Sequence, residues 1–499
     1  MLEAESTFEK VNEKFLKKGF ILEKDALELL VTQSGYDRFI NYLKDRKMVF
    51  VSREIVEDFF FPRIEERRKF EFKAEKLPLD KFLKRKRPKP RRIEAEIEIV
   101  RNVSDQYSEG KFQDFLELFQ DRFERLSRIF RMKPSMRDFS TIPTVLKRRK
   151  REKVKTVGIV TEKRVTSNNN VILTIEDRGE FIKVLVHNRW KKLFELARYI
   201  VEDEVIGVEG VMGESIIFAN AVEFPDIPIG RSLNKSRENI SVALLSDLHV
   251  GSKMFLEKAF LRFIRWLNLK YEKQMELAST VKYLIIAGDI ADGIGIYPNQ
   301  REELDIDDLI EQYEKTAELL SLVPKRIKIL IVPGNHDAVR IAEPQLPISE
   351  VYAKSLYELE NVMMLGNPSV VDLHSVRILI YHGASLIETS SKFGLSFERA
   401  PKIMELLLRK RHLSPIYGTN PIVPLPKDHL LIEDVPDLFV TGHIHVTGHS
   451  NYRGTTLINA GCWMKQSQYQ KMRNINPTPA KIPIFNLKNH NTTIMNFGG

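Results

Sequence analysis

The 499-residue sequence contains a single cysteine, Cys462, and so has no pair that could form an internal disulfide framework. An unpaired cysteine is most often a small buried residue, and we assign Cys462 no chemistry. No apolar run reaches about 20 residues, the length that a membrane-spanning helix requires. The first residues, MLEAESTFEK, lack the basic-then-apolar pattern of a secretory signal. These absences predict a cytoplasmic protein.

The composition is that of a folded, multidomain chain. Hydrophobic residues make up 43% and charged residues 29%, which excludes a largely disordered protein. A chain of this length is too long for one ordinary core, so we expect two or three domains. The net charge of +10 suits a polyanionic partner, but a Lys/Glu-rich surface of a thermophilic protein would give the same excess. Charge alone therefore does not decide the function.

The first part of the chain changes character near residue 70. Residues 1–70 have apolar positions every three or four residues, which predicts a small N-terminal helical module. Residues 71–153 contain the basic runs KFLKRKRPKPRR and LKRRKREK on either side of the amphipathic stretch FQDFLELFQDRFERLSRIFRM. We interpret this region as a basic linker with one helix. Its basic runs fit a solvated tether and direct contact with phosphates about equally well.

Residues 154–226 have the short alternating pattern of β-strands. Five such segments occur, TVGIVTEKRV, NVILTIED, FIKVLVH, EVIGVEGVM and SIIFANAVEF, and the helical segment WKKLFELARYIV precedes the last two. This order indicates an OB-type β-barrel. Such barrels commonly bind single strands by stacking bases on aromatic side chains. Because these strands carry few aromatics, a packing role is at least as well supported as strand binding.

Residues 240–499 repeat one pattern five times, a short apolar strand that leads into polar residues. The segments are SVALLSDLHVG, VKYLIIAGDIADG, IKILIVPGNHD, VRILIYHG and DLFVTGHIH. Continuous apolar strands are buried on both faces, so helices should cover the sheets of an α/β sandwich. Functional side chains in such sheets lie just beyond the carboxyl ends of the strands. The polar residues at these ends are Asp247, His249, Asp289, Asn335, His336, His382, His443 and His445.

These residue types indicate a site for two metal ions. Carboxylates, an amide oxygen and several imidazoles form a mixed oxygen and nitrogen ligand set, which suits Mn, Fe or Zn better than Ca or Mg. Asp247 and His249 are two positions apart, so on an extended strand end they share one face, and His443 and His445 repeat this spacing. Gly288, Gly334, Gly383 and Gly442 would let the backbone turn tightly beside the ions.

The motifs resemble those of the calcineurin-like metallophosphoesterases, whose signature is Asp-x-His, Gly-Asp, Gly-Asn-His-Asp, His and Gly-His-x-His in this order. A single short motif occurs by chance, but five in the right order, each after a strand, do not. The resemblance implies a four-layer α/β/β/α sandwich. It also implies that one ion is held by Asp247, His249, Asp289 and His445, and the second by Asp289, Asn335, His382 and His443.

The same resemblance assigns roles to two residues that are not metal ligands. His336 would stabilise or protonate the leaving oxygen of a phosphoester. Asp292 occupies the position at which phosphatase members carry a carboxylate that orients this histidine, so an Asp292 to His336 hydrogen bond is predicted. A cap on the helix or turn after the strand is an equally good interpretation of Asp292. The remaining histidines, His187, His374, His412, His429, His449 and His490, match no motif and are assigned structural or surface positions.

The order of domains resembles the small subunits of replicative DNA polymerases, from about residue 95 to the end. Stretches that look specifically like the small subunits of archaeal family D polymerases are GIVTEKRVTSNNNVILTIED, EVIGVEGVMG, GDIADGIGIYP, LLLRKRHLSPIYG and NINPTPAKIPIFNL. The resemblance implies a 3′-to-5′ proofreading exonuclease that works with a separate large polymerase subunit on single-stranded or mispaired 3′ ends of DNA. A sliding clamp is a further candidate partner. Mn is the favoured metal by resemblance, with Fe or Zn as alternatives.

Two other functions stay open at this point. The chain could be a structural scaffold subunit with little activity, or an independent break-repair nuclease. Break-repair nucleases of this superfamily begin with the phosphoesterase domain, which argues against the last alternative. The long segment between Tyr381 and Leu438 contains the basic run RKRH at 409–412, which could guide a strand or dock the large subunit. An ordinary surface insertion explains this segment equally simply.

Overall fold

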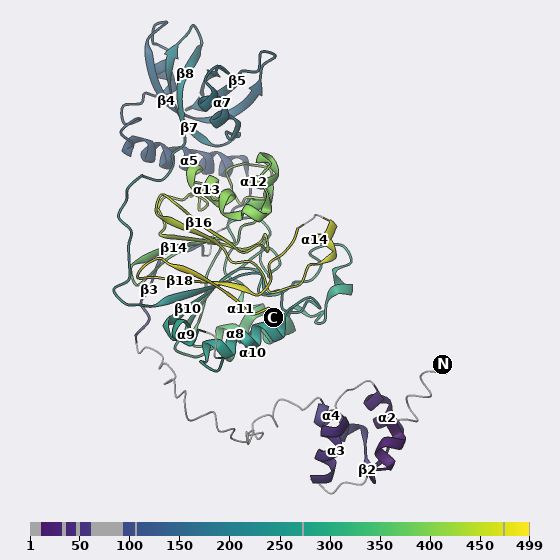
Figure 1. The fold of residues 1–499 in the computed structure, drawn as a ribbon. Coiled ribbons are helices and arrows are strands. Elements are labelled where there is room, and N and C mark those ends of the chain that lie inside the picture. Colours follow the sequence, from purple (N-terminus) through teal and green to yellow (C-terminus); the bar gives the residue numbers. More distant parts are fainter. Residues whose placement is uncertain are drawn as a thin grey trace. The chain divides into compact units, whose positions relative to one another are not determined.

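The computed structural model describes residues 11–31, 36–45, 50–60, 93–104, 107–271, 274–472 and 475–498. Contacts within the chain divide it into two compact units, Met1–Lys86 and Arg87–Gly499 (Figure 1). Among the described residues, no helix is both long enough and apolar enough to cross a membrane. The multidomain α/β character predicted from the sequence is confirmed, because a β-barrel and mixed β-sheets occur in one chain with helices.

The Met1–Lys86 unit is a small helical cluster with a pair of very short strands. Its elements are β1 (Ile21–Leu22), α2 (Lys24–Val31), α3 (Tyr36–Asp45), β2 (Phe50–Val51) and α4 (Arg53–Phe60). β1 and β2 pair in parallel. Phe15, Phe39 and Leu43 are fully buried in its core, which accounts for the apolar periodicity of the sequence.

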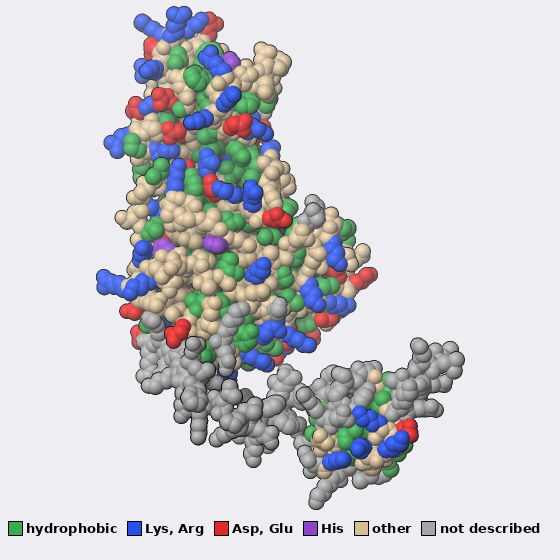
Figure 2. Space-filling model, in the orientation of Figure 1, with side chains coloured by type: hydrophobic (Ala, Val, Ile, Leu, Met, Phe, Trp, Pro, Cys, Tyr) green, Lys and Arg blue, Asp and Glu red, His purple; other side chains and the backbone are tan. Residues whose placement is uncertain are grey.

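A closed β-barrel occupies residues 153–223, all of which are described. Its elements are β4 (Lys153–Val165), β5 (Val171–Asp177), β6 (Glu180–Val186), α7 (Lys191–Arg198), β7 (Val205–Met212) and β8 (Ile216–Glu223). The strands close in the order β4-β5-β6-β8-β7, in which β6 and β8 are parallel and the other pairs antiparallel. The five strands and the helix between the third and fourth agree with the sequence pattern. Figure 2 shows Lys and Arg side chains gathered on the end of the barrel at the top of the view and mixed with Asp and Glu elsewhere.

Two helices and one strand lie in the region that the sequence pattern assigned to a linker. They are β3 (Ile97–Arg101), α5 (Phe112–Met132) and α6 (Ile142–Val145). β3 pairs with a strand of the following domain, so the described residues after 93 are integral parts of the larger unit. α5 is the amphipathic helix that the sequence predicted. It runs between the barrel and the rest of the unit (Figure 1), with Leu126 and Phe130 buried against Val157 of β4.

The remaining strands form two sheets. Within the described residues, the first has the order β12-β11-β10-β9-β18-β19 and the second the order β16-β17-β15-β14-β13-β3. The first contains β9 (Ser241–Leu245), β10 (Val281–Ala287), β11 (Lys328–Val332), β12 (Val362–Met364), β18 (Lys481–Asn486) and β19 (Thr492–Asn496). The second contains, besides β3, β13 (Ser369–Leu373), β14 (Val376–Ile380), β15 (Leu438–Thr441), β16 (Gly448–Tyr452) and β17 (Thr455–Asn459). β9 to β12 are mutually parallel, and so are β14, β15 and β17.

Apolar side chains fill the space between the two sheets and beneath the helices on their outer faces. Val242 and Ile285 of the first sheet share one core with Ile378 and Val440 of the second. Helices α8 (Glu257–Leu267), α9 (Met275–Thr280), α10 (Leu309–Ser321) and α11 (Glu350–Tyr357) share a core with the first sheet. Helices α12 (Ser385–Phe393) and α13 (Ala400–Lys410) pack against the second. The shorter elements η3 (Gln300–Glu303), η4 (Phe397–Arg399) and α14 (Gln468–Met472) lie in connecting segments.

Candidate metal centre

The polar residues that follow the apolar strands meet in one place. Those after β9, β10 and β11 come from the first sheet, and those after β14 and β15 from the second. Because these strands present their carboxyl ends at the same edge, their side chains can converge. Three groups of potential ligands result: Asp247 with His249 and His445, Asp289 with His382 and His443, and His249 with Asp292 and His336. Asn335 joins the second group, with its Oδ1 3.0 Å from His382 Nε2.

In the first group, three side chains direct ligand atoms at one another. The Nε2 atoms of His249 and His445 are 3.2 Å apart, and His445 Nε2 lies 3.2 Å from Asp247 Oδ1. His249 Nε2 is 3.8 Å from the same carboxylate oxygen. All three residues are buried. They therefore enclose a small space bounded by one oxygen and two nitrogens.

In the second group, His382 lies at the centre. Its Nε2 is 3.3 Å from Asp289 Oδ2 and 3.1 Å from His443 Nδ1. Asp289 also approaches the first group, since its Oδ2 lies 3.9 Å from His249 Nε2. The carboxylate of Asp289 thus lies between the two groups, where the sequence resemblance places a ligand shared by two ions.

The backbone at this site is strained. Asp247, His249, Asp289, His443 and His445 all have φ between 52° and 67°, although none is glycine. Non-glycine residues rarely adopt this conformation, and such strain is concentrated at functional sites. Close packing adds a second constraint, because a Cβ at Gly334 would overlap Asp289 Oδ1. The rest of the fold thus holds the backbone in an unfavourable conformation that brings these side chains together.

The donor set fits divalent cations better than it fits a metal-free cluster. Asp247 Oδ1 is buried and has no hydrogen-bond partner among the described residues. A buried carboxylate oxygen without a partner is costly. His382 Nδ1 lies 2.8 Å from the carbonyl oxygen of Ala287, to which it would donate, so Nε2 turns a lone pair toward the oxygens of Asp289 and Asn335. A proton or a cation between His382 Nε2 and these oxygens removes the repulsion between their lone pairs.

The electrostatics agree with this interpretation. Burial lowers the pKa of His382, but the Asp289 carboxylate more than offsets this effect and raises it to about 10. Burial and the neighbouring His382 lower the pKa of His443 to about 3. Burial raises the pKa of Asp289, yet His382 and His336 hold it below its usual range. The site therefore keeps a proton on His382 that a divalent cation would displace, because metal ligation and protonation compete for the same lone pair.

Asp292 contacts His336 through its backbone oxygen and not, as predicted, through its carboxylate. Within the described chain, the Asp292 carboxylate makes no hydrogen bond to His336. Its Oδ1 lies 2.9 Å from His249 Nδ1 instead, while the backbone oxygen of Asp292 lies 2.7 Å from His336 Nδ1. The prediction that this carboxylate orients His336 is therefore wrong. The tight turn after β10 directs the side chain toward the metal-ligand histidine and the main chain toward His336.

Three side chains that the sequence reasoning left unassigned support the site. Gln300 donates to Asp292 Oδ2 at 3.0 Å, and Gln470 Nε2 lies 2.7 Å from His445 Nδ1. The buried Asp337 accepts from the backbone NH groups of Gly334 and Ala291. Burial, with help from the charge on Asp289, raises the pKa of Asp337 to about 7. Its place in the Gly-Asn-His-Asp motif was a usable signal, whereas neither glutamine belongs to a motif.

The groups of potential metal ligands adjoin a cleft of about 360 Å³. Its polar lining residues are His249, Asp289, Asp292, Asn335, His336, His443, His445, Ser467 and Gln470. Its apolar lining comes from Ile296, Tyr297 and Pro298 in one segment and from Ile387, Ile444, Met464 and Ile475 elsewhere. Such a cleft admits a ligand with an anionic group and an apolar part.

The basic run at 409–412 does not face this cleft. Lys410 is buried and forms an ion pair with the buried Glu204 of the barrel. His412 Nε2 lies 2.9 Å from Asp428 Oδ2, which also accepts from Arg122 of α5. The run therefore joins the barrel to the part of the unit that contains the two six-stranded sheets. Its predicted use as a guide for DNA or a dock for a partner is wrong for Lys410, Arg411 and His412, because these side chains are buried inside the unit.

Comparison with known proteins identifies the family. A family model that describes the B-type subunits of DNA polymerases alpha and epsilon matches residues 242–447. The DNA polymerase II small subunit of Methanothermobacter thermautotrophicus is 42% identical over 402 residues, which cover 80% of this chain and 82% of that protein. The DNA polymerase II small subunit of Archaeoglobus fulgidus is 38% identical over 497 residues, or 95% of each chain. The chain belongs to the DNA polymerase II small subunit family.

Membership of the DNA polymerase II small subunit family confirms the resemblance to archaeal family D small subunits. The matched residues 242–447 include every predicted metal ligand. Among solved structures, an archaeal phosphodiesterase is similar at 13% identity with a TM-score of 0.27, over 51% of this chain and 99% of that one. A TM-score this low supports no conclusion about activity.

Proposed function

We propose that this chain is the 3′-to-5′ proofreading exonuclease subunit of a replicative DNA polymerase and hydrolyses terminal phosphodiesters of DNA. Its partner would be a large catalytic subunit, since the relatives are named small subunits of a DNA polymerase. The observation that carries the proposal is the convergence of seven potential metal ligands beside His336 at the base of a cleft. Membership of a DNA polymerase subunit family supports DNA as the substrate, and the side chains of the site support hydrolysis of phosphoesters as the reaction.

The finer architecture belongs to the same proposal. We interpret the closed barrel as an OB-type fold and the two sheets with their outer helices as a four-layer metallophosphoesterase sandwich. The proposed domains are a helical module at 1–70, a linker region at 71–153, the barrel at 154–226 and the phosphoesterase at 240–499. Within 71–153, the described strand β3 already belongs to the second sheet, so the linker in this scheme is shorter than the sequence pattern indicated.

Two divalent ions fit the side chains at the site. Asp247, His249, Asp289 and His445 would hold one, and Asp289, Asn335, His382 and His443 the other. Mn²⁺ is our first choice, and Fe or Zn suit the same donors. A pair of such ions lowers the pKa of water and neutralises charge on phosphate oxygens.

The chain's own residues supply the remaining chemistry. His336 Nδ1 is engaged by the Asp292 backbone oxygen at 2.7 Å, which leaves Nε2 for a phosphoester in the cleft. Burial lowers the pKa of His336, and an anionic phosphate beside Nε2 would favour the protonated form again. A water attacks phosphorus and releases a proton to solvent, the bond from phosphorus to the 3′-oxygen breaks, and His336 protonates that oxygen. The products are a 5′-mononucleotide and a strand one nucleotide shorter.

Two alternatives predict different behaviour. A scaffold subunit would keep the fold without hydrolysis, which the full set of ligand side chains and the strained backbone argue against. An independent break-repair nuclease would not co-purify with a polymerase subunit. Family membership favours the polymerase assignment over this second alternative.

The test is an end-labelled exonuclease assay on the full chain with Mn²⁺, alone and with its co-expressed large subunit. We expect mononucleotides to be released from a mismatched 3′ end. His336→Ala should lower this rate by about a hundredfold or more, the usual contribution of a positioned proton donor. The exposed His449 provides the control His449→Ala, which should cleave like the wild type. Intact DNA with the wild-type chain, with and without its partner, would refute the enzymatic proposal.

A further inference from the structure

The cleft beside the proposed metal ligands has an aromatic side chain other than histidine at one place in its lining. Tyr297 is half-buried on the wall beside His336, with the two ring centroids 6.4 Å apart. The lining outside the metal-ligand candidates also includes the aliphatic or thioether side chains of Ile387, Ile444, Met464 and Ile475 and the polar side chains of Ser467 and Gln470. Apart from the histidines, Tyr297 is the one aromatic residue among the described residues that line the cleft. A flat apolar ring is thus available on one side of the site only.

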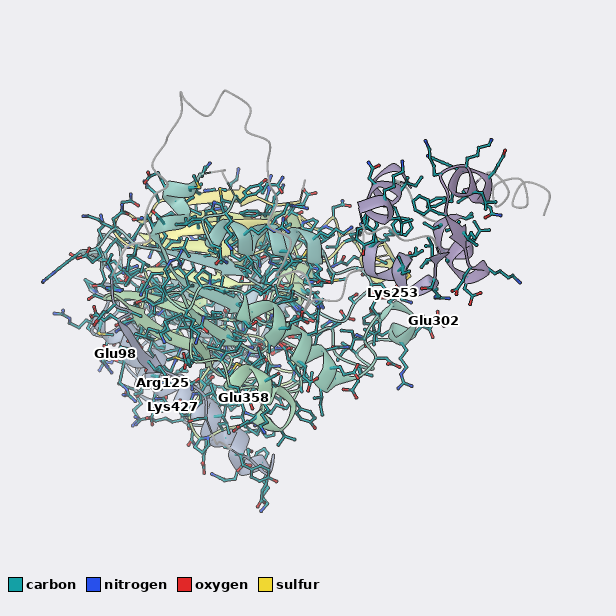
Figure 3. The ribbon with its side chains drawn as sticks, turned by 90° about the horizontal axis from the view of Figure 1, so that it is seen from below. Glu98, Arg125, Lys253, Glu302, Glu358 and Lys427 are labelled. Carbon is teal, nitrogen blue, oxygen red and sulfur yellow. The ribbon has the colours of Figure 1, made fainter. Side chains whose placement is uncertain are left out.

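The turn that carries Tyr297 is held in place by several contacts. Its hydroxyl donates to Glu303 Oε2 at 2.9 Å, which fixes the end of the ring. Gln300 accepts from the Ile296 backbone NH at 2.8 Å and donates to the Asp292 backbone oxygen at 2.9 Å. At the other side of this segment, Lys253 Nζ donates to the Glu302 backbone oxygen at 2.8 Å, and the two residues lie next to each other in Figure 3. The ring is therefore positioned before any ligand arrives.

The place of Tyr297 relative to His336 determines which part of a DNA strand it can reach. In the proposed reaction, His336 protonates the 3′-oxygen that leaves phosphorus. That oxygen belongs to the penultimate nucleotide, because the terminal one departs with its 5′-phosphate. The sugar at His336 is then the penultimate sugar, and Tyr297, whose ring centroid is 6.4 Å from that of His336, offers its base the one aromatic surface other than histidine among the described cleft residues. Aromatic side chains hold bases of single strands by stacking, largely without regard to sequence.

We propose that Tyr297 is the stacking platform for the nucleobase of the penultimate nucleotide, on the leaving side of the scissile phosphodiester; this assignment rests on the proposed exonuclease function. The terminal nucleotide occupies the aliphatic side of the cleft and is not stacked on an aromatic ring. Tyr297 is therefore a substrate-binding residue whose contact is insensitive to which base is mispaired at the end. This arrangement suits removal of any terminal nucleotide.

The test compares three oligonucleotides that differ only in where one base is missing. They carry all bases, an abasic terminal nucleotide or an abasic penultimate nucleotide. With Mn²⁺ and the full chain, Tyr297→Ala should lower kcat/KM about tenfold or more on the first two, since base stacking on an aromatic ring contributes this much. On the third, Tyr297→Ala and the wild type should be equally active. Tyr297→Phe keeps the ring and loses only the hydrogen bond to Glu303, so on the first two oligonucleotides it should restore most of the rate that Tyr297→Ala loses.

Tyr357 gives a matched control, because its half-exposed ring lies outside the cleft and its hydroxyl also donates, to the Ile348 backbone oxygen. Tyr357→Ala should cleave all three oligonucleotides like the wild type. The proposal is overturned if Tyr297→Ala acts like the wild type on the intact strand. It is also overturned if the loss disappears with the terminal rather than the penultimate abasic nucleotide, or persists equally on all three.

A binding measurement separates failure of this inference from failure of the proposed function. With the full chain in EDTA, where no cleavage occurs, a fluorescent 2-aminopurine at the penultimate position should be quenched by the wild type and by Tyr297→Phe, but not by Tyr297→Ala. Equal quenching by all three contradicts the stacking contact, whether or not the chain is a nuclease. A wild type that quenches this probe but releases nucleotides only from 5′ ends, or releases none, contradicts the exonuclease proposal alone.

Discussion

Asp292 connects the proposed metal ligand His249 to the rest of the turn after β10. Its carboxylate accepts from His249 Nδ1 at 2.9 Å and from Gln300 at 3.0 Å. A carboxylate on the outer nitrogen of a ligating histidine fixes the tautomer and the orientation of the ring, and it raises the basicity of the ligating nitrogen. At the scale of single residues, Asp292 is therefore a positioning residue for the metal centre, although the sequence resemblance had paired it with His336.

Asp292→Asn is expected to weaken Mn²⁺ binding by about 10- to 100-fold, the usual effect of losing such a partner. Titration of the metal-free full chain with Mn²⁺ measures this loss without reference to activity. Asp305→Asn, which changes an exposed carboxylate in the same connecting segment, should bind Mn²⁺ like the wild type. Unchanged Mn²⁺ affinity in Asp292→Asn would contradict this positioning role.

The sequence predicted which side chains converge, but it did not predict the residues that hold these side chains in position by hydrogen bonds. Each ligand candidate follows an apolar strand. Because such strands present their carboxyl ends at the same edge of a sheet, the sequence pattern alone could place Asp247, His382 and His445 together. Their metal-binding roles stay predictions. The contacts of Gln300 and Gln470 depend on the path of loops and on rotamers, which strand periodicity does not constrain. Such supporting residues become visible only when the chain is folded.

At the scale of elements, the alternation of apolar and polar residues predicted strands correctly where the paired strands are close in sequence. The barrel strands β4 to β8 follow one another within 71 residues, and their pattern predicted each of them. β3 was missed, because its sequence IEIVR lies among charged residues and its partner β13 is far along the chain. Its formation depends on a tertiary contact that no local pattern contains.

The buried side chain of His429 should make the stability of the fold depend on pH. It is 5% exposed, and its ring nitrogens have no hydrogen-bond partner among the described residues. Burial, with the nearby cations Arg101 and Lys427, lowers its pKa to about 4. Lys427 lies near Arg125 of α5 in Figure 3. The folded state thus keeps this imidazole neutral well below the pH at which an unfolded chain would protonate it.

The folded pKa of about 4 lies below the unfolded value of about 6.5, so the unfolded chain binds the extra proton first as the pH falls. The contribution of His429 to stability is complete above about pH 6.5 and is lost progressively toward pH 4. We expect Tm to fall between pH 7 and pH 5, and to fall less in His429→Gln, which cannot take up this proton. Thermal unfolding at both pH values measures the difference. His449→Gln is the control, and an equal fall in Tm for wild type and His429→Gln would contradict the assignment.

At the scale of the whole molecule, buried charges join the barrel of the Arg87–Gly499 unit to the region that contains the two six-stranded sheets. Lys410 of α13 pairs with Glu204 next to β7 and donates to the Tyr199 backbone oxygen at 2.6 Å. Both charged side chains are almost fully buried. Removing one partner of a buried pair leaves the other charge without compensation, which is far costlier than losing the pair as a whole.

Lys410→Met should therefore lower the free energy of unfolding by about 3–5 kcal/mol. The double variant Lys410→Met with Glu204→Gln should recover much of this loss, because no uncompensated charge remains. Urea denaturation of the full chain measures both. Lys402→Met breaks the surface pair with Glu405 on the same helix and should change stability by about 1 kcal/mol or less. If the single and double variants are equally unstable, the ion pair does not hold the junction.

The sequence pattern predicted the barrel and the α/β domain that follows it, because each has its own internal pattern of strands. It did not reveal how they join. The RKRH run was interpreted as an outward-facing basic surface, since charge in a sequence usually marks solvent. Glu204 and Asp428, which neutralise it, are more than 200 residues apart, and nothing in a linear pattern pairs them with Lys410 and Arg122.

The central claim is that these side chains hold two ions, and it is tested most directly by counting them. The metal-free full chain is titrated with Mn²⁺ and the bound ions per chain are measured at saturation. The account predicts two ions for the wild type, one each for Asp247→Ala and His382→Ala, and none for Asp289→Ala, the shared ligand. A wild type that binds fewer than two ions, or variants that bind as many as the wild type, would contradict it.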